Sequence, residues 1–210
     1  MGLLFCMLAG AVYVFRRARR RPAETPPPPV RVPAAPARID PFAVPRLAFT
    51  GPGGGDAVRA LILDLLTERP SEPIEVVVPR TDVAELLGLF PTDLTTERIP
   101  GLKLVDDFPD VLAHLRRHEQ RRMLVVCVGV HEGLYELCRQ QSGHTAVITL
   151  SPWTYPTVDV DGTGKVIAAS EPDLLASLPA TLPLVLPEDC VARLTDLPTV
   201  SVRPTGPRPS

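Results

Sequence analysis

The sequence predicts an α/β protein: a three-layer sandwich in which helices cover both faces of a mostly parallel, five-stranded sheet, with a β-hairpin near the C-terminus. Short β-branched runs alternate with segments of helical periodicity, which favours parallel strands joined by right-handed crossovers. The run MLVVCVGV at residues 123–130 is almost continuously apolar, as in a central strand buried on both faces. A glycine-rich turn at residues 51–55 joins a strand to a helix, which is typical of Rossmann-like and P-loop-like folds.

The expected strands are short apolar runs bounded by turn residues. They cover residues 47–50, 74–78, 102–105, 123–130 and 146–150, and the hairpin strands cover residues 157–160 and 165–168. The expected helices have N-cap residues or apolar residues at i, i+3 and i+4 spacing. Three of them are capped by Asp56, Asp82 and Asp107, one follows residue 130, and a short one covers residues 172–178.

Proline usage divides the chain into four parts. The 210 residues include 26 prolines, which cluster toward the two ends. Residues 22–45 are too rich in proline for a helix or a sheet, and we expect a semi-rigid spacer there. Residues 1–21 precede this linker, the α/β domain is expected over residues 46–200, and residues 201–210 are expected to form a disordered tail.

The N-terminus predicts a membrane anchor. Residues 2–15 carry no charge, and five arginines follow between positions 16 and 21. Such a block marks the cytoplasmic side of a membrane, so we expect a single-pass anchor in the cell membrane with the C-terminal domain in the cytoplasm. The apolar run has 14 residues, whereas about 20 are typical of a membrane-spanning helix. Bilayer thinning and snorkelling arginines are the mechanisms that would accommodate the difference.

Charge and cysteine usage exclude several function classes. The formal net charge of −2 provides no overall basic face, so no nucleic acid partner is expected. The four cysteines show no C-x-x-C spacing, which predicts buried thiols in a reducing compartment rather than a zinc site. They are Cys6, Cys127, Cys138 and Cys190.

Two histidines have the spacing of metal ligands on a helix. His114 and His118 are four residues apart, but arginines surround them and no third ligand lies nearby in the sequence. This pattern predicts a solvated surface patch. We therefore expect no metal and no cofactor.

The glycine-rich turn has the layout of a phosphate-binding loop but lacks its chemistry. A P-loop counted from Gly51 would need Gly-Lys-Ser/Thr at positions 56–58, where the chain has Asp-Ala-Val. A dinucleotide fingerprint also ends at Asp56, which stands in place of the third glycine. We expect Asp56 to cap the helix and to repel phosphate from the same amides, which favours a structural turn over a nucleotide site. The candidate ligand-binding residues here are Gly51, Gly53, Gly54, Gly55 and Asp56.

Further candidates follow the other strands, at the edge where open α/β sheets bind ligands. His131 and Glu132 could act as a base and its orienting group, with Asp106 nearby; the alternative is that they are ordinary residues at the start of a helix. The strand at residues 123–130 has no acidic residue for magnesium, and Ser151 lacks the G-x-S-x-G motif of a nucleophile. No catalytic residue is assigned.

Two aromatic residues stand in the loop after the fifth expected strand. Trp153 and Tyr155 lie in the sequence SPWTYPTV. On a loop above a sheet, such side chains form either an anchor for a protein partner or a cover over the core at the sheet edge. Both interpretations are consistent with the sequence.

Several segments together resemble a known group of proteins. They are the apolar N-terminus with its arginine block, the proline-rich linker, LAFTGPGGGDAVRALILDLL, EVVVPRTDVAELLG, IPGLKLVDDFPDVLAHL and the SPW…VDVDGTG hairpin. The combination is similar to a segment of large membrane-anchored actinobacterial proteins, which resemble transcriptional regulators with a LysM-type or transmembrane front end and a bacterial transcriptional activator domain. The resemblance implies a regulatory role.

These observations predict a membrane-tethered, cytosolic α/β domain without catalytic machinery, which binds a protein partner or serves as a regulatory module. The alternative is a nucleotide-binding protein or hydrolase that uses residues 51–55 together with His131 and Glu132.

Overall fold

The computed structural model describes residues 39–67, 73–89, 99–140 and 143–197. The predicted anchor at residues 2–15 and the predicted tail at residues 201–210 lie outside these ranges, as does most of the predicted linker. Within the described ranges, none of the helices combines the length and the apolarity that a bilayer crossing requires.

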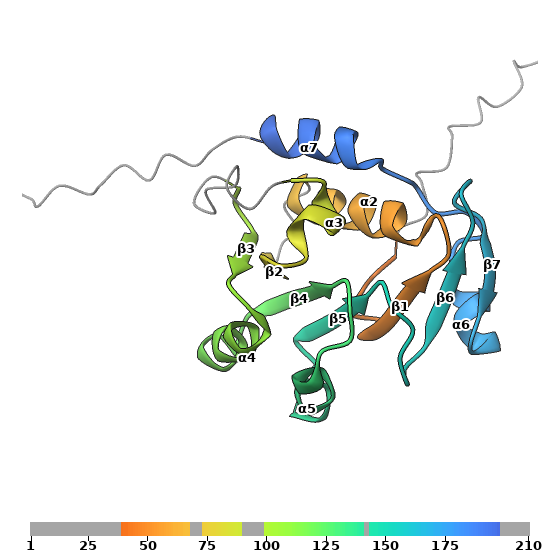
Figure 1. Ribbon diagram of the computed structural model, residues 1–210. Helices are drawn as coiled ribbons and strands as arrows, with labels where there is room; N and C mark the ends of the chain where they lie inside the picture. The colour runs from red at the N-terminus through yellow and green to blue at the C-terminus, as the bar shows by residue number, and fades with distance from the viewer. Residues whose placement is uncertain (1–38, 68–72, 90–98, 141–142, 198–210) are drawn as a thin grey trace, which may run out of the picture. The chain divides into compact units, whose positions relative to one another are not determined.

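The described chain is an α/β domain with a seven-stranded, mostly parallel sheet (Figure 1). The strand order is β3-β2-β4-β5-β1-β6-β7. The strands are β1 (Arg46–Thr50), β2 (Ile74–Pro79), β3 (Leu102–Val105), β4 (Arg122–Cys127), β5 (Thr145–Thr149), β6 (Thr157–Val160) and β7 (Val166–Ala169).

The prediction of a five-stranded sheet with a separate hairpin was wrong in one respect. The hairpin forms, with β6 and β7 antiparallel, but β6 also pairs in parallel with β1, so both strands belong to the sheet. The turn residues between β6 and β7 define the hairpin locally. The hairpin joins the sheet by pairing with the free backbone groups of β1. Local sequence does not reveal which strand edge is available for such pairing.

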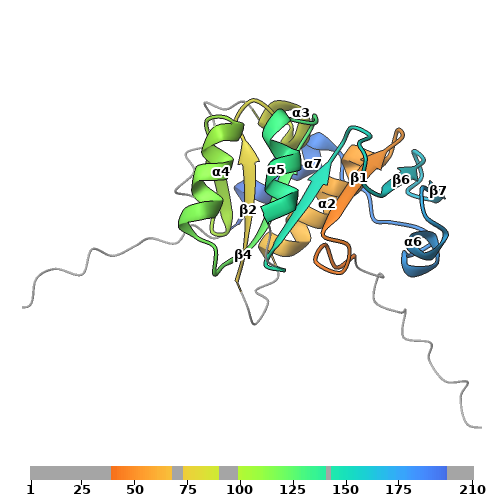
Figure 2. The same ribbon diagram turned by 90° about the horizontal axis from the view of Figure 1, so that it is seen from below.

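Helices cover both faces of the sheet (Figures 1 and 2). In the view of Figure 1, α2, α3 and α7 lie above the sheet, and α4 and α5 lie below it. The helices are α2 (Gly54–Thr67), α3 (Val83–Leu87), α4 (Phe108–Arg117), α5 (Glu132–Gln140), α6 (Pro172–Ser177) and α7 (Pro187–Thr195).

The core has two parts because successive side chains of a strand point to opposite faces. The α2-side core contains Leu47, Phe49, Val76, Val78, Leu124, Val126, Ile148 and the buried residues of α2, α3 and α7. The α4-side core contains Val77, Val125, Cys127, Val147 and the buried residues of α4 and α5. Strand β4 contributes to both parts, which confirms the predicted central strand buried on both faces, although the strand ends at Cys127 and not at residue 130.

Helix α2 begins at Gly54, so Asp56 lies in its first turn and not at the predicted N-cap position. The amide of Ala57 already donates to the carbonyl of Gly53 at 2.9 Å. The side chain of Asp56 pairs with Arg59, one turn further along the helix. The capping prediction for Asp56 was wrong because the glycines before it enter the helix, which leaves its carboxylate available to a buried guanidinium.

His114 is buried, contrary to the prediction of a solvated patch. Its Nε2 lies 2.7 Å from Oε2 of Glu75 on β2. Position 114 follows Val111 by three residues and therefore lies on the same buried stripe of α4. The cap of this helix was predicted correctly: the carboxylate of Asp107 accepts a hydrogen bond from the amide of Asp110 at 3.0 Å.

Two segments outside the predicted elements pack against the α2-side core. Ile39 and Phe42, which lie in the predicted linker, pack against it. Helix α7, which was not predicted, buries Cys190 and Leu194. Its start carries recognisable signals, because Pro187 occupies the first turn together with two acidic residues.

Candidate functional site

The glycine-rich turn is closed by the chain's own hairpin. The amide of Gly53 donates to the carbonyl of Val160 at 3.0 Å, and a Cβ at position 53 would lie 2.0 Å from the carbonyl oxygen of Asp161. Gly51 has φ of +79°, and a Cβ there would lie 2.1 Å from Oδ1 of Asp159. Only glycine permits both contacts. A phosphate would have to displace the Val160 carbonyl to reach the Gly53 amide.

The carboxyl ends of β2 and β4 form a topological switch point of the sheet. The two strands are neighbours. Helix α3, which follows β2, packs into the α2-side core, whereas α5, which follows β4, packs into the α4-side core. The two connections therefore leave toward opposite faces (Figure 1). This is the position at which open α/β sheets bind ligands.

Side chains from both neighbouring strands hold the peptide groups of Val128, directly after β4. The carboxylate of Asp82, after β2, accepts a hydrogen bond from the Val128 amide at 2.8 Å. The hydroxyl of Ser151, after β5, donates to the Val128 carbonyl at 2.9 Å. The hydroxyl of Thr81 donates to the second oxygen of Asp82 at 2.9 Å. The backbone leading to His131 is thus anchored on two sides.

Asp82, Cys127 and His131 meet at this point. Their ligand atoms, one carboxylate oxygen, Sγ and an imidazole nitrogen, all lie within 4.8 Å of one another. Nε2 of His131 is 3.7 Å from Oδ2 of Asp82, and it is a buried nitrogen without a hydrogen-bond partner. The His131 ring stacks on Phe108, with centroids 4.8 Å apart and planes at 10°, which fixes its orientation.

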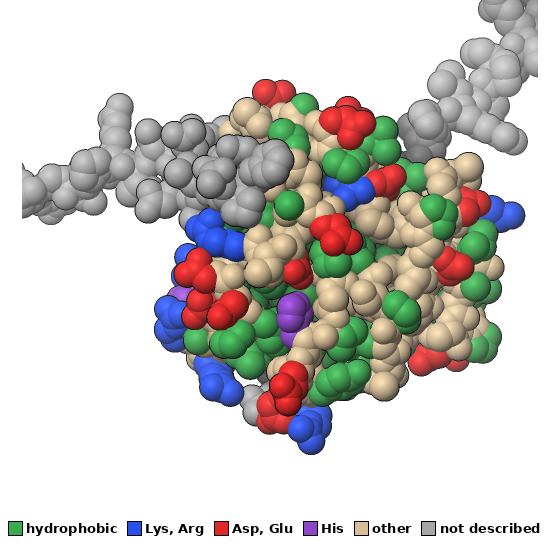
Figure 3. Space-filling model, viewed as in Figure 1, with side chains coloured by type: hydrophobic (Ala, Val, Ile, Leu, Met, Phe, Trp, Pro, Cys, Tyr) green, Lys and Arg blue, Asp and Glu red, His purple; other side chains and the backbone are tan. Residues whose placement is uncertain are grey.

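The surroundings of these three residues differ from one another. Cys127 is fully buried and Asp82 is 8% exposed, whereas the side chain of His131 is 33% exposed. The space-filling view shows apolar and acidic side chains interspersed on the face of the domain seen in Figure 1 (Figure 3). The carboxylate, the thiol and Nε2 of His131 are therefore buried, while other atoms of the His131 side chain reach the surface.

The Cys127 thiol does not have the properties of a catalytic nucleophile. Burial raises its pKa, and the charge of Asp82 raises the pKa further. The thiolate is the nucleophilic form of cysteine, and activation requires a lowered pKa. Proximity to His131 therefore does not make Cys127 a nucleophile in this arrangement.

The other residues predicted at this edge have separate positions. Glu132 is the exposed first residue of α5, and Asp82 is the carboxylate that lies beside His131. Asp106 forms an ion pair with Arg80, with Oδ1 3.1 Å from Nε. Strand β5 separates β4 from β1, so the glycine-rich turn is two strand spacings away from His131, about 10 Å.

Sequence reasoning missed Asp82 as a site residue. It was predicted as a helix cap, and it does stand at the N-cap position of α3, but its side chain makes no capping hydrogen bond. The carboxylate turns to β4 instead. Because Asp82 and Val128 are 46 residues apart, no local pattern could have revealed this pairing. The local signal that could have pointed to this edge is an acidic residue three positions after the end of β2.

The aromatic residues of the loop after β5 cover the α4-side core. Trp153 and Tyr155 are half-buried and pack against it, and their ring centroids are 4.7 Å apart in an edge-on arrangement. Tyr135 of α5, which is 38% exposed, extends the cluster, with its ring 6.3 Å from Trp153. The guanidinium of Arg46 lies 5.1 Å from the Tyr155 ring. The cluster both closes the core and presents an aromatic edge to the surface.

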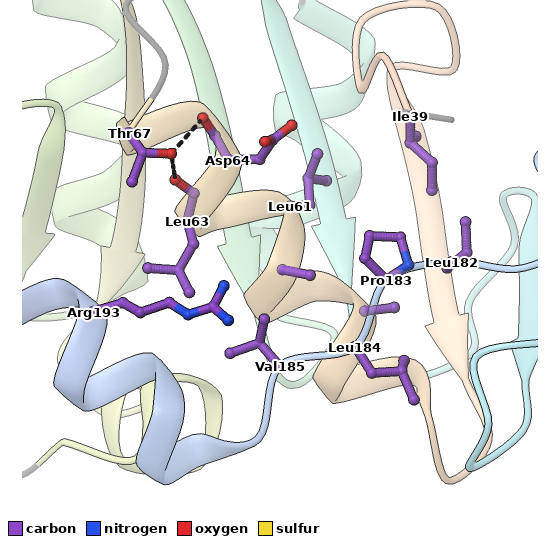
Figure 4. A pocket seen from close by; sticks show the side chains of 12 residues that line it. Ile39, Leu61, Leu63, Asp64, Thr67, Leu182, Pro183, Leu184, Val185 and Arg193 are labelled. Carbon is purple, nitrogen blue, oxygen red and sulfur yellow. Dashed lines mark hydrogen bonds between the residues drawn. The ribbon is translucent and has the colours of Figure 1, made fainter. Parts of the chain in front are cut away.

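Two pockets of the described chain are not lined by Asp82, Cys127 or His131. One, of about 300 Å³, lies between α2, the segment before α7, and α7 itself, and its lining is mostly apolar (Figure 4). Asp64 and Arg193 are its charged residues. The other, of about 410 Å³, lies beside β3 and α4, and its lining is mostly polar, with charges of both signs.

Comparison of the chain with protein-family models, with curated proteins and with solved structures gave no match.

Proposed function

We propose that this chain is a membrane-tethered, cytosolic α/β domain that binds a protein partner in a regulatory role and does not bind nucleotides. In this proposal the turn at residues 51–55 is a degenerate form of a Rossmann-like or P-loop-like turn, which has kept its shape without its ligand. The tether at residues 2–15 and the regulatory role rest on the sequence alone, the latter on the resemblance to regulators described above.

The observation that supports the loss of nucleotide binding is the hydrogen bond from the Gly53 amide to the Val160 carbonyl. In phosphate-binding turns, the amides at the helix N-terminus point at the ligand. Here the hairpin supplies the acceptor, and its backbone approaches so closely that position 53 has no room for a Cβ. The oxygen of a backbone carbonyl is the negative end of a dipole, so it also disfavours a phosphate at the same place.

The proposed partner surface is the aromatic edge formed by Tyr135, Trp153 and Tyr155. Aromatic residues dominate the energetics of protein interfaces because they bury a large rigid area and keep a polar group at their edge. Val130, 37% exposed, stands before α5, the helix that carries Tyr135, and adds an exposed aliphatic side chain. Partner binding at this edge would remove these apolar groups from water.

Ligand-dependent thermal unfolding of the full chain tests the nucleotide part of the proposal. We expect ATP, GTP and NAD, each with and without magnesium, to leave the midpoint of unfolding unchanged, because a ligand that binds only the native state must raise it. Stabilisation at micromolar nucleotide would contradict the proposal and favour the alternative, a nucleotide-binding protein or hydrolase.

Site-specific photo-crosslinking in cells tests the partner surface. A photo-crosslinking amino acid at position 135 is expected to capture a discrete protein, while the same amino acid at position 167, where Ile167 is 52% exposed on β7, is expected not to. Equal capture at both positions would reject this surface. For the tether, membrane fractionation should recover the full chain with membranes and a variant without residues 1–21 in the soluble fraction.

A further inference from the structure

We infer that Asp82, Cys127 and His131 form a binding site for a divalent transition metal ion, for which zinc is the best-fitting ion. This inference goes beyond the proposed partner-binding function and uses a different part of the domain. Within the ranges that the structure describes, these three residues are the group whose histidine, cysteine and acidic side chains converge closely enough to hold a metal.

The donor set points to zinc. A thiolate, an imidazole nitrogen and a carboxylate oxygen are the ligands of Zn²⁺ in proteins, whereas magnesium and calcium select oxygen atoms alone. Three protein ligands leave the fourth tetrahedral position vacant for water or another ligand, as in zinc sites that act on a bound molecule. The inferred site is therefore an open one.

The three ligand atoms lie close enough together for one ion to reach all of them after a small movement. Bond lengths of about 2.0 to 2.3 Å in a tetrahedron place neighbouring ligand atoms about 3.3 to 3.7 Å apart. Oδ2 of Asp82 and Nε2 of His131 are 3.7 Å apart, and one ligand atom from each of the three residues lies within 4.8 Å of the others, so the ligands would move closer together when a metal binds. The 3.7 Å distance is too long for a hydrogen bond but short enough for an ion pair when His131 is protonated, so a metal and a proton would compete for the same imidazole nitrogen.

The unpartnered nitrogen of His131 is the second observation that supports the site. Nε2 is buried and has no hydrogen-bond partner, although buried polar atoms almost always have one. A metal ion would satisfy its lone pair. The stacked ring of Phe108 holds the imidazole in place, so a metal would meet a ligand that is already oriented.

Hydrogen bonds hold the carboxylate in the same way. One oxygen of Asp82 accepts from the Val128 amide and the other from the Thr81 hydroxyl. Each carboxylate oxygen has two lone pairs, so one remains on Oδ2 for a metal. When the metal binds, the Cys127 thiol releases its proton to solvent and the sulfur forms the metal bond, so the process consumes no other reactant.

The position in the fold explains the access route. The site lies at the switch point, between the carboxyl ends of β2 and β4, where His131 is one-third exposed. The exposed atoms belong to the rest of the imidazole side chain, because Nε2 itself is buried, so a metal would reach the three ligand atoms past the edge of the His131 ring. The thiol and the carboxylate would lie beneath it in a poorly hydrated environment, which strengthens charge interactions.

Metal analysis of the full chain, purified in mild detergent, tests the inference. We expect one equivalent of Zn²⁺ per chain by mass spectrometry of the metal content. After substitution with Co²⁺, the spectrum should show a thiolate-to-cobalt charge-transfer band together with the intense visible bands of a tetrahedral ion. A chain that takes up no zinc, or a cobalt complex without the charge-transfer band, would overturn the inference.

Matched variants locate the ligands. C127S, H131Q and D82N should each weaken zinc binding by more than about 100-fold. Mutation of residues that only hydrogen-bond to metal ligands already lowers metal affinity by about 10- to 100-fold. C138S changes another buried cysteine of the α4-side core, and H118Q changes a histidine outside the site; neither should alter the affinity. Circular dichroism shows whether each variant folds. The cobalt spectrum is measured on the unmutated chain, so it tests the inference even if a variant does not fold. If C138S or H118Q weakened binding as much as C127S, the assignment would be wrong.

Discussion

The carboxylate of Asp82 accepts a hydrogen bond from the amide of Val128 at 2.8 Å, and this contact joins the ends of β2 and β4. It forms because the two strands are parallel neighbours in the sheet, with Ile74 opposite Arg122 and Val77 opposite Val125. The carboxyl ends of both strands therefore meet at one edge. The contact positions Asp82 beside His131 and at the same time orders the turn that follows β4.

Replacement of Asp82 should reveal this structural role. We expect D82A to lower the free energy of unfolding by about 1 to 3 kcal/mol, because the Val128 amide loses its acceptor in a partly buried site. D82N keeps an acceptor oxygen and should cost less. Urea denaturation followed by circular dichroism measures both values. If D82A were as stable as the unmutated chain, the amide would not depend on this carboxylate.

The two glycines at positions 53 and 55 should respond in opposite directions to alanine. G53A places a Cβ 2.0 Å from the Asp161 carbonyl oxygen, so the hairpin must move, and we expect a loss of at least about 1 to 3 kcal/mol. G55A meets its nearest neighbour, the Arg59 side chain, at 3.5 Å and should stabilise α2 by about 0.5 to 1 kcal/mol. Thermal or urea unfolding compares the pair, and equal effects would contradict the packing described for this turn.

Arg59 should be among the most sensitive polar positions of the domain. Its buried guanidinium donates to the carbonyls of Val185 at 2.9 Å and Leu86 at 3.0 Å, and it pairs with Asp56. R59L should therefore cost about 3 to 5 kcal/mol, since it leaves the Asp56 carboxylate without its partner in a mostly buried position.

A matched surface pair provides the control for Arg59. Arg139, whose side chain is 74% exposed, also pairs with an acidic residue three positions away on its own helix. R139L should change stability by no more than about 0.5 kcal/mol. Urea denaturation of both variants checks the difference. If R59L and R139L lowered the free energy of unfolding by similar amounts, burial of the ion pair would not explain its contribution to stability.

The stability of the domain should fall in alkaline solution partly through Cys190. Burial raises the pKa of this thiol from 9.0 to about 11, against the opposing effect of the arginines at positions 59 and 193. The folded state therefore keeps the proton that the unfolded state releases. The stabilisation is complete below pH 9 and is lost as the pH rises from 9 toward about 11.

The variant C190A isolates this contribution. Its free energy of unfolding should decline less steeply between pH 9 and pH 11 than that of the unmutated chain, because the other titrating groups are common to both. Urea denaturation across this pH range measures the two slopes. Parallel curves would mean that the thiol ionises equally in the folded and unfolded states.

Much of the architecture could be predicted from local sequence. The apolar runs at residues 74–78 and 102–105 became strands, as did the first part of the run at residues 123–130, and Asp107 caps α4 as expected. Strand periodicity and capping depend on residues within a few positions of one another. The turn at Asp161 likewise formed the expected hairpin. Helix α7 was missed, although Pro187 and the acidic residues after it mark its start.

The sequence by itself determined the α/β class, the strand positions and the glycine-rich turn, since each depends on local periodicity and turn chemistry. Only the tertiary structure decided which groups meet. The strand order placed Asp82 beside His131 and Cys127, the pairing of β6 with β1 brought Val160 onto Gly53, and Arg59 drew Asp56 away from the helix cap. The physical reason is that a side chain's partner across a sheet depends on which strands are neighbours, and neighbouring strands can lie far apart in sequence.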